Sequence, residues 1–271
     1  MIRIYTISNS RPDFILMQNE MFKRHLKEDY EFTVFNNTHL DAENHHRCMF
    51  IDKAIADVGA QDIPVQYDGE LAKELQRKEE TCSIFNGRGF YSSPNVANAY
   101  ALCWAWKNVI GKERGNICLL DSDVFLTADI MLSSYLVSHD LCYVPQARPG
   151  VEYMWNAFVL ADLKRLPVPE TIDWYCGKVN GVPVDVSGQT SRYLSTHPGV
   201  RKNFIQPCYT EFDNTLDFSP ADYETFWIGH PHISGSKEKF ALHYRSGSNW
   251  NGRSDDYHER KTAWLKKQLS L

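Results

Sequence analysis

Apolar residues in the first half of the chain follow an alternating pattern of strand-like runs and helix-like spacing. Short β-rich runs cover residues 2–7 and 30–37. Each precedes a segment with the three-to-four-residue apolar spacing of a helix, at 14–26 and 41–59. Gly59 is a typical helix stop. Another helix is predicted over 93–111, opening with Ser-Pro and ending at a glycine, and a charged, solvated helix over 69–80.

An apolar strand-like run is interrupted by two aspartates in "GNICLLDSDVFL", residues 115–126. An apolar run of this kind is typical of a central parallel strand that is covered on both faces. Strands that alternate with helices predict a doubly wound α/β sheet, in which ligands bind at the carboxyl ends of the strands.

The pattern is looser beyond residue 140. Strands are predicted over 140–145 and 153–161, a helix within 185–200, and a terminal helix over 255–269 that packs through Trp264 and Leu265. Turn residues and aromatics dominate 197–237. We find no linker-like segment and no repeat, and therefore expect a single domain, 1–271, with a less regular C-terminal half.

Composition narrows the range of partners. A formal charge of −5 gives no basic field for nucleic acid. The seven cysteines are scattered without a CxxC pair, which predicts reduced thiols and a cytoplasmic protein. The N-terminus is interpreted as a strand and not a signal peptide, and no apolar run approaches the roughly 20 residues of a membrane span, so we expect a protein without a transmembrane segment.

Asp121 and Asp123 come at the end of the apolar strand. Residues two apart in a strand point to the same side, so the two carboxylates can converge on one hard cation such as Mn²⁺ or Mg²⁺. The alternative is a strand-end turn in which the aspartates cap the following loop. Their position at the ligand edge of the sheet favours the metal site.

A second group of candidate residues lies in "ALHYRSGSNW", residues 241–250. His243 offers an imidazole nitrogen to a metal, and Gly247 and Ser248 offer backbone N–H groups to a phosphate. A structural histidine under the sheet is the alternative. A ligating histidine has to be neutral, and its reference pKa is about 6.5.

Together these motifs resemble the GT-A glycosyltransferases, in particular glycogenin and related bacterial galactosyltransferases. The order is "DSD" at 121–123, "WNAFVL" at 155–160, "VDVSGQT" at 184–190 and "HYRSGSNW" at 243–250. Phe158 stands where that family has glycine, and Ser248-Asn249 replace Lys-Pro, so Arg245 or Arg253 could supply the positive charge instead. Compact, anchorless viral and microbial enzymes are the nearest comparison.

The resemblance implies a mixed, mostly parallel GT-A sheet flanked by helices, and a metal-dependent enzyme. Such an enzyme moves a hexose or pentose from a nucleoside diphosphate sugar, here a UDP-sugar, to a glycan or other hydroxyl acceptor. Residues 1–126 would form the nucleotide-binding half, and 127–271 the acceptor-side half with a C-terminal lid. The implied metal ligands are Asp121, Asp123 and His243.

Further roles follow from this resemblance. The implied nucleotide-binding residues are Thr6, Ser8, Arg11, Asn36, Asn37, Asn95, Asn98, Asp121, Gly247 and Ser248. Asp185 or Asp213 would be the base of an inverting reaction, and Gln189 would face the sugar in a retaining one. Trp155, Trp174, Tyr175 and Trp227 are aromatics that could stack on sugars or belong to the core.

Two other functions fit a sheet with an aspartate pair. Nucleotidyltransferases that make NDP-sugars typically carry a Gly-rich, basic loop after the first strand, and "TISNSRPD" has neither feature. A non-enzymatic carbohydrate-binding or scaffold protein would use the aspartates structurally. Binding of UDP with and without Mn²⁺ separates these classes.

Overall fold

The computed structural model describes residues 1–8, 11–38, 50–80, 94–208, 223–231, 235–245 and 254–271. One mixed sheet takes strands from all of these segments except 254–271, in the order β3-β2-β1-β4-β7-β6-β10-β11-β12-β5. Its strands are β1 (Ile2–Ser8), β2 (Tyr30–Asn36), β3 (Gln61–Pro64), β4 (Asn116–Asp121), β5 (Val124–Leu126), β6 (Leu141–Arg148), β7 (Val151–Asp162), β10 (Lys202–Cys208), β11 (Glu224–Gly229) and β12 (Lys237–His243).

Most strands of this sheet point the same way. The ladders make β1, β2, β3, β4, β6, β10 and β12 run in one direction, while β7, β11 and β5 run in the other. The predicted mixed, mostly parallel sheet flanked by helices is confirmed. A separate hairpin is formed by β8 (Gly177–Val179) and β9 (Val182–Val184).

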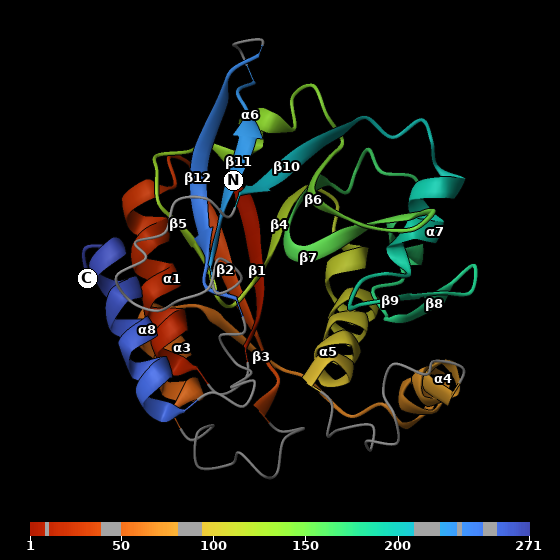
Figure 1. Ribbon diagram of the computed structural model, residues 1–271, viewed down its shortest axis with the longest axis horizontal. Helices are drawn as coiled ribbons and strands as arrows, with labels where there is room; N and C mark the ends of the chain where they lie inside the picture. The colour runs from red at the N-terminus through yellow and green to blue at the C-terminus, as the bar shows by residue number, and fades with distance from the viewer. Residues whose placement is uncertain (9–10, 39–49, 81–93, 209–222, 232–234, 246–253) are drawn as a thin grey trace.

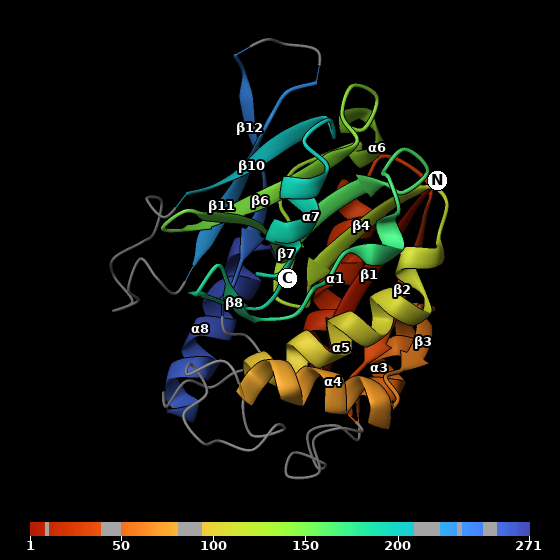
Figure 2. The same cartoon turned by 90° about the vertical axis from the view of Figure 1, so that its right-hand side faces the viewer.

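Helices cover both faces of the sheet (Figures 1 and 2). On one face lie α1 (Pro12–His25), α3 (Ile51–Val58) and α8 (Asp255–Gln268), and on the other α4 (Gly69–Glu80), α5 (Pro94–Asn108) and α7 (Thr190–Thr196). Alternate residues of β1 show the division, because Ile4 faces the first core and Tyr5 the second. Short helical turns are α6 (Leu132–Tyr135), η4 (Ile110–Lys112) and η5 (Pro169–Thr171).

Local sequence explains the predicted helices. Pro12 occupies the first turn of α1, where its missing N–H costs no helical hydrogen bond. Gly59 ends α3 in the left-handed conformation that glycine adopts without strain. Trp264 and Leu265 are buried on the packing face of α8, as predicted. Residues 41–49 of the predicted second helix lie outside the described segments.

The sequence analysis missed five strands. These are β3, the β8–β9 hairpin, and the pair β10 and β11 within the stretch where turn residues and aromatics dominate. β12, which ends at His243, continues the same sheet beyond β11. The C-terminal half therefore extends the sheet, and its strands lie beside those of residues 1–126.

A ladder of three residue pairs joins the aspartate turn to the end of the C-terminal half. β12 pairs antiparallel with β5, which follows directly after Asp121–Asp123, and His243 lies opposite Val124. This register places His243 next to the aspartate turn.

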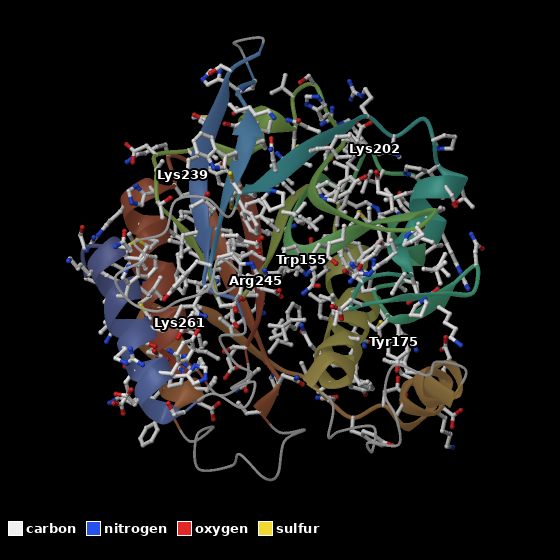
Figure 3. The ribbon with its side chains drawn as sticks, viewed as in Figure 1. Trp155, Tyr175, Lys202, Lys239, Arg245 and Lys261 are labelled. Carbon is white, nitrogen blue, oxygen red and sulfur yellow. The ribbon has the colours of Figure 1, made fainter. Side chains whose placement is uncertain are left out.

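Helix α8 holds the end of β12 in place. The buried Lys261 donates from Nζ to the carbonyl oxygens of Tyr244 (2.6 Å) and Arg245 (2.9 Å), and it lies 3.8 Å from the centre of the Tyr244 ring. Lys261 and Arg245 are marked in Figure 3. α8 also packs along α1, where Arg24 donates to the carbonyl of Leu269.

No helix in the described segments is long and apolar enough to cross a membrane. Five cysteines lie in those segments, and all five are free thiols: Cys103, Cys118, Cys142, Cys176 and Cys208.

We predict that Lys261→Met lowers the free energy of unfolding by about 1–3 kcal/mol, because the buried carbonyl of Tyr244 and the partly buried carbonyl of Arg245 lose their charged donor. Chemical denaturation measures the change. Lys267→Met, an exposed lysine on the same helix, is the matched control and should stay within about 0.5 kcal/mol of the parent. Equal stability of the two variants would contradict this role of Lys261.

Candidate metal centre

Asp121, Asp123 and His243 converge at one end of the sheet. Asp121 is the last residue of β4, Asp123 lies in the two-residue turn before β5, and His243 is the last residue of β12. One ligand atom from each lies within 4.8 Å of the others. Asp123 and His243 are buried, at 7% and 3% exposed, and Asp121 is half-buried. The predicted set of three is therefore brought together.

The turn that carries the aspartates is held from two sides. The fully buried Gln18 of α1 donates from Nε2 to the carbonyl oxygens of Asp121 (2.9 Å) and Val124 (3.0 Å). From the other side, the backbone N–H of Tyr244 donates to the carbonyl of Asp123 (2.8 Å). These two braces use only backbone oxygens of the turn.

His243 lies between two carboxylates. Its Nε2 is 3.2 Å from Asp123 Oδ1, and its Nδ1 is 2.6 Å from Oε1 of Glu224, a fully buried residue at the start of β11. The half-buried Trp155 contacts the imidazole edge-on, with ring centres 5.1 Å apart. Sequence reasoning missed Glu224 and Gln18, since neither belongs to a recognisable motif.

The close approach of these charged groups shifts the pKa values of Asp121 and His243. Burial and the nearby Asp123 carboxylate raise the pKa of Asp121 to about 7. Burial lowers the pKa of His243, but the Asp123 and Glu224 carboxylates outweigh that effect and raise it to about 9. The reference value of 6.5 used in the sequence analysis therefore does not apply to His243.

A hydrogen-bond chain links the aspartates to the predicted catalytic segment. Asn156 of β7 donates from Nδ2 to Asp121 Oδ1 (2.6 Å), and its side-chain oxygen lies 3.3 Å from the hydroxyl of Ser187. The segment 185–190 fits tightly here, because a Cβ at Gly188 would lie 2.3 Å from Cβ of Val184. Glycine is required at that position.

Asp185 and Gln189 both belong to this segment. Asp185 is half-buried. Its charge also raises the pKa of Asp121, but this effect is smaller than those of burial, Asp123, His243 and Asn156. Gln189 is buried and donates from Nε2 to the carbonyls of Lys178 and Cys176, while its Oε1 has no hydrogen-bond partner among the described residues. Their catalytic roles stay predictions.

The predicted nucleotide-binding residues end the neighbouring strands. Thr6 and Ser8 lie in β1, fully buried, and their hydroxyl oxygens lack hydrogen-bond partners within the described segments. Asn36 ends β2 and uses its amide to donate to Asp52 (2.6 Å) and to accept from Thr38. Asn37 follows and donates its backbone N–H to the carbonyl of Ser8.

Arg11 has structural partners. Its guanidinium forms an ion pair with Asp13 (2.6 Å), donates to Thr262 of α8 and lies 3.7 Å from the centre of the Phe14 ring. It therefore joins α1 to α8. A nucleotide contact from Arg11 stays a prediction.

Several predicted residues lie outside what the structure describes. These are Asp213, Gly247, Ser248 and Arg253, together with the side chain of Asn95. Asn98 is half-buried in α5.

Among the aromatics, Trp174 and Tyr175 are fully buried and belong to the second core. Trp227 is half-buried in β11. Of these four, Trp155 is the one with a ring contact to the candidate metal centre within the described segments, and that contact is with His243. Figure 3 shows Trp155 near Arg245 and Tyr175 on the α4 side of the molecule.

The donor set suits a divalent cation. Two carboxylates and one imidazole supply hard oxygen ligands and a borderline nitrogen, a combination that accepts Mn²⁺ and Mg²⁺. Their ligand atoms converge without any shift of the backbone, and the buried negative charge of the pair needs a positive partner. The residues present therefore fit the cation that the sequence predicts.

Comparisons with known proteins give matches only among solved structures, since no protein-family model and no curated protein matches the chain. One match is the galactosyltransferase LgtC in complex with donor and acceptor sugar analogs, at 10% identity and a TM-score of 0.38, covering 73% of this chain and 66% of that one. An active-site mutant of LgtC matches at 11% identity and a TM-score of 0.49, covering 98% of this chain and 95% of that one.

Mouse xyloside xylosyltransferase 1 in its apo form matches at 11% identity and a TM-score of 0.40, covering 75% of this chain and 84% of that one. These proteins are glycosyltransferases. They are the kind of enzyme that the sequence motifs resemble.

We predict that Mn²⁺ affinity rises steeply with pH. Below pH 7 the cation has to displace protons from both Asp121 and His243, and between pH 7 and 9 from His243 alone, so affinity should rise about tenfold per pH unit in the upper range. Anaerobic calorimetric titrations at pH 6, 7, 8 and 9, in buffers of different ionisation enthalpy, give the affinity and the number of protons released. A pH-independent affinity without proton release would show that these groups do not bind the ion.

Proposed function

We propose that this chain is a glycosyltransferase that depends on a divalent cation and moves a sugar from a UDP-sugar to a hydroxyl acceptor. The single observation that carries the proposal is the convergence of Asp121, Asp123 and His243 at the carboxyl end of β4. In α/β sheets this edge is where nucleotides bind. The motif order from residue 121 to 250 supports the same reaction.

Breaking the bond between the sugar and the diphosphate develops negative charge on the leaving group. A bound Mn²⁺ or Mg²⁺ supplies Lewis-acid stabilisation of that charge. Asp121, Asp123 and His243 would hold the ion, while Gln18 and the Tyr244 N–H keep the aspartate turn rigid. A rigid turn lowers the reorganisation needed during the reaction.

The nucleotide would bind over the ends of β1 and β2. Ser8 and Asn37 lie there beside each other, and the buried side-chain oxygens of both lack a hydrogen-bond partner among the described residues. Buried polar atoms usually find a partner, so a bound ribose or base is a fitting one. Asn36 has a second role in this proposal, because it anchors the strand end to α3 through Asp52.

The acceptor would approach from β7 and the segment 185–190. If the reaction inverts the anomeric centre, Asp185, whose charge acts on Asp121, would accept a proton from the attacking hydroxyl. In a retaining reaction the Oε1 of Gln189 would face the sugar, because its Nε2 is already bound to backbone carbonyls. Trp155 beside His243 offers an indole face to either sugar.

We predict that Asp123→Ala lowers sugar transfer and donor hydrolysis by about 100-fold or more, because the cation loses a ligand at the charge that develops. UDP release is measured with a panel of UDP-sugars, which also identifies the donor. Asp129→Ala, at an exposed aspartate outside the site, is the matched control and keeps full activity. Mn²⁺-dependent turnover that persists in a folded Asp123→Ala protein would remove the metal assignment.

We also predict that activity disappears in EDTA and returns with added Mn²⁺ or Mg²⁺. The sequence 243–253 contains no lysine, so the cation is the main counter-charge for the diphosphate. Measuring UDP release before chelation, after it and after metal restoration tests this. Full activity in EDTA would transfer the role to Arg245 and Arg253. Failure to bind UDP at all would favour a scaffold protein.

A further inference from the structure

Glu224 is a charged residue in a fully buried position. It begins β11 and lies opposite His243 in the antiparallel ladder with β12. Its side chain is 0% exposed, and Oε1 lies 2.6 Å from Nδ1 of His243. Burying a carboxylate is costly unless it is paired, so a residue of this kind at this place requires an explanation.

The contact with Glu224 determines which imidazole nitrogen is free. An ionised carboxylate can only accept a hydrogen bond, so Nδ1 of His243 has to carry a proton. In the neutral ring that leaves the lone pair on Nε2. Nε2 is the nitrogen that faces Asp123, at 3.2 Å. In the neutral ring the lone pair therefore lies on the side of Asp123.

Packing keeps the ring in that orientation. Trp155 contacts the imidazole edge-on, and the Phe226 ring centre lies 5.6 Å away on the neighbouring strand. A ring flip would exchange Nδ1 and Nε2 and break the 2.6 Å contact with Glu224. The contacts with Glu224, Trp155 and Phe226 thus determine both the tautomer and the orientation of the imidazole.

We propose that Glu224 is a positioning residue that presents Nε2 of His243 to the cation. Glu224 acts through His243, because the cluster of convergent ligand atoms in the described segments consists of Asp121, Asp123 and His243 without it. In metal sites such carboxylates fix the tautomer and raise the basicity of the ligating imidazole. The inference rests on the proposed metal-dependent function.

The experiment compares Mn²⁺ affinities by calorimetry at one pH, with no substrate present. Glu224→Gln keeps the shape of the side chain and removes its charge, and it should weaken Mn²⁺ binding about 10- to 100-fold. Asp140→Asn is the matched control, since Asp140 is a buried carboxylate that pairs with Arg201 away from the site. Its Mn²⁺ affinity should equal that of the parent, whatever its melting temperature.

A double-mutant cycle shows whether Glu224 acts through the imidazole. In a His243→Ala background, Glu224→Gln should cause no further loss of Mn²⁺ affinity, because the group that it positions is absent. An equal loss in both backgrounds would overturn the inference, and so would a Glu224→Gln protein that binds Mn²⁺ within twofold of the parent. Thermal melts check folding, and Glu224→Asp replaces Glu224→Gln if the latter does not fold, with the same outcomes.

Failure of the proposed function gives a different result. If the parent protein does not bind Mn²⁺, or binds it equally well after Asp123→Ala, the metal site itself is wrong. If Asp123→Ala abolishes binding while Glu224→Gln leaves it unchanged, only the role of Glu224 is wrong.

Discussion

Three carboxylates lie close to one imidazole at the end of the sheet. Their negative charge has to be balanced, and the site depends on how this is done. Asp123 and Glu224 contact opposite nitrogens of His243, and Asp121 is held by Asn156. In the metal-free protein protons partly supply the missing positive charge, which is why the pKa values of Asp121 and His243 move to about 7 and about 9. In the proposed function, a divalent cation would bring the same charge in one atom. Protons and the cation would then compete for the same three side chains.

Rigid elements hold each member of this group. The aspartate turn is braced by Gln18 from α1, and the end of β12 is held by Lys261 from α8. α1 and α8 are in turn joined by the contacts of Arg11 and Arg24. A site placed on strand ends and supported by helices keeps its ligand atoms within the narrow range of distances that a metal requires. The two ends of the described chain thereby contribute to one support.

Much of the first half of the fold, and the grouping of Asp121, Asp123 and His243, were predictable from sequence, because periodicity and motif spacing are local signals. The helices at α1, α4, α5 and α8 and the strands β1, β2 and β4 follow from such patterns. β10 and β11 were missed, since short strands rich in aromatics and turn residues are recognised only through their partners in the sheet. Glu224 was missed because a glutamate in an apolar strand shows its purpose only when His243 lies opposite it. Asp121, Asp123 and His243 could be picked out from sequence motifs. The residues that orient them could not, because their contacts join segments that are distant in the sequence.

The ladder between β5 and β12 has a consequence for the order of folding. Three residue pairs join segments that are separated by residues 127–236, so the ladder forms only after a long loop has closed. The aspartate turn follows β4, which pairs with β1 and β7, whereas His243 ends the last strand of the described chain. Opening of β12 and α8 alone would separate the imidazole from the carboxylates and leave the first four parallel strands paired. The cation would then act as a clasp on the final strand, and amide hydrogen exchange in β12 and α8 would slow most when it binds.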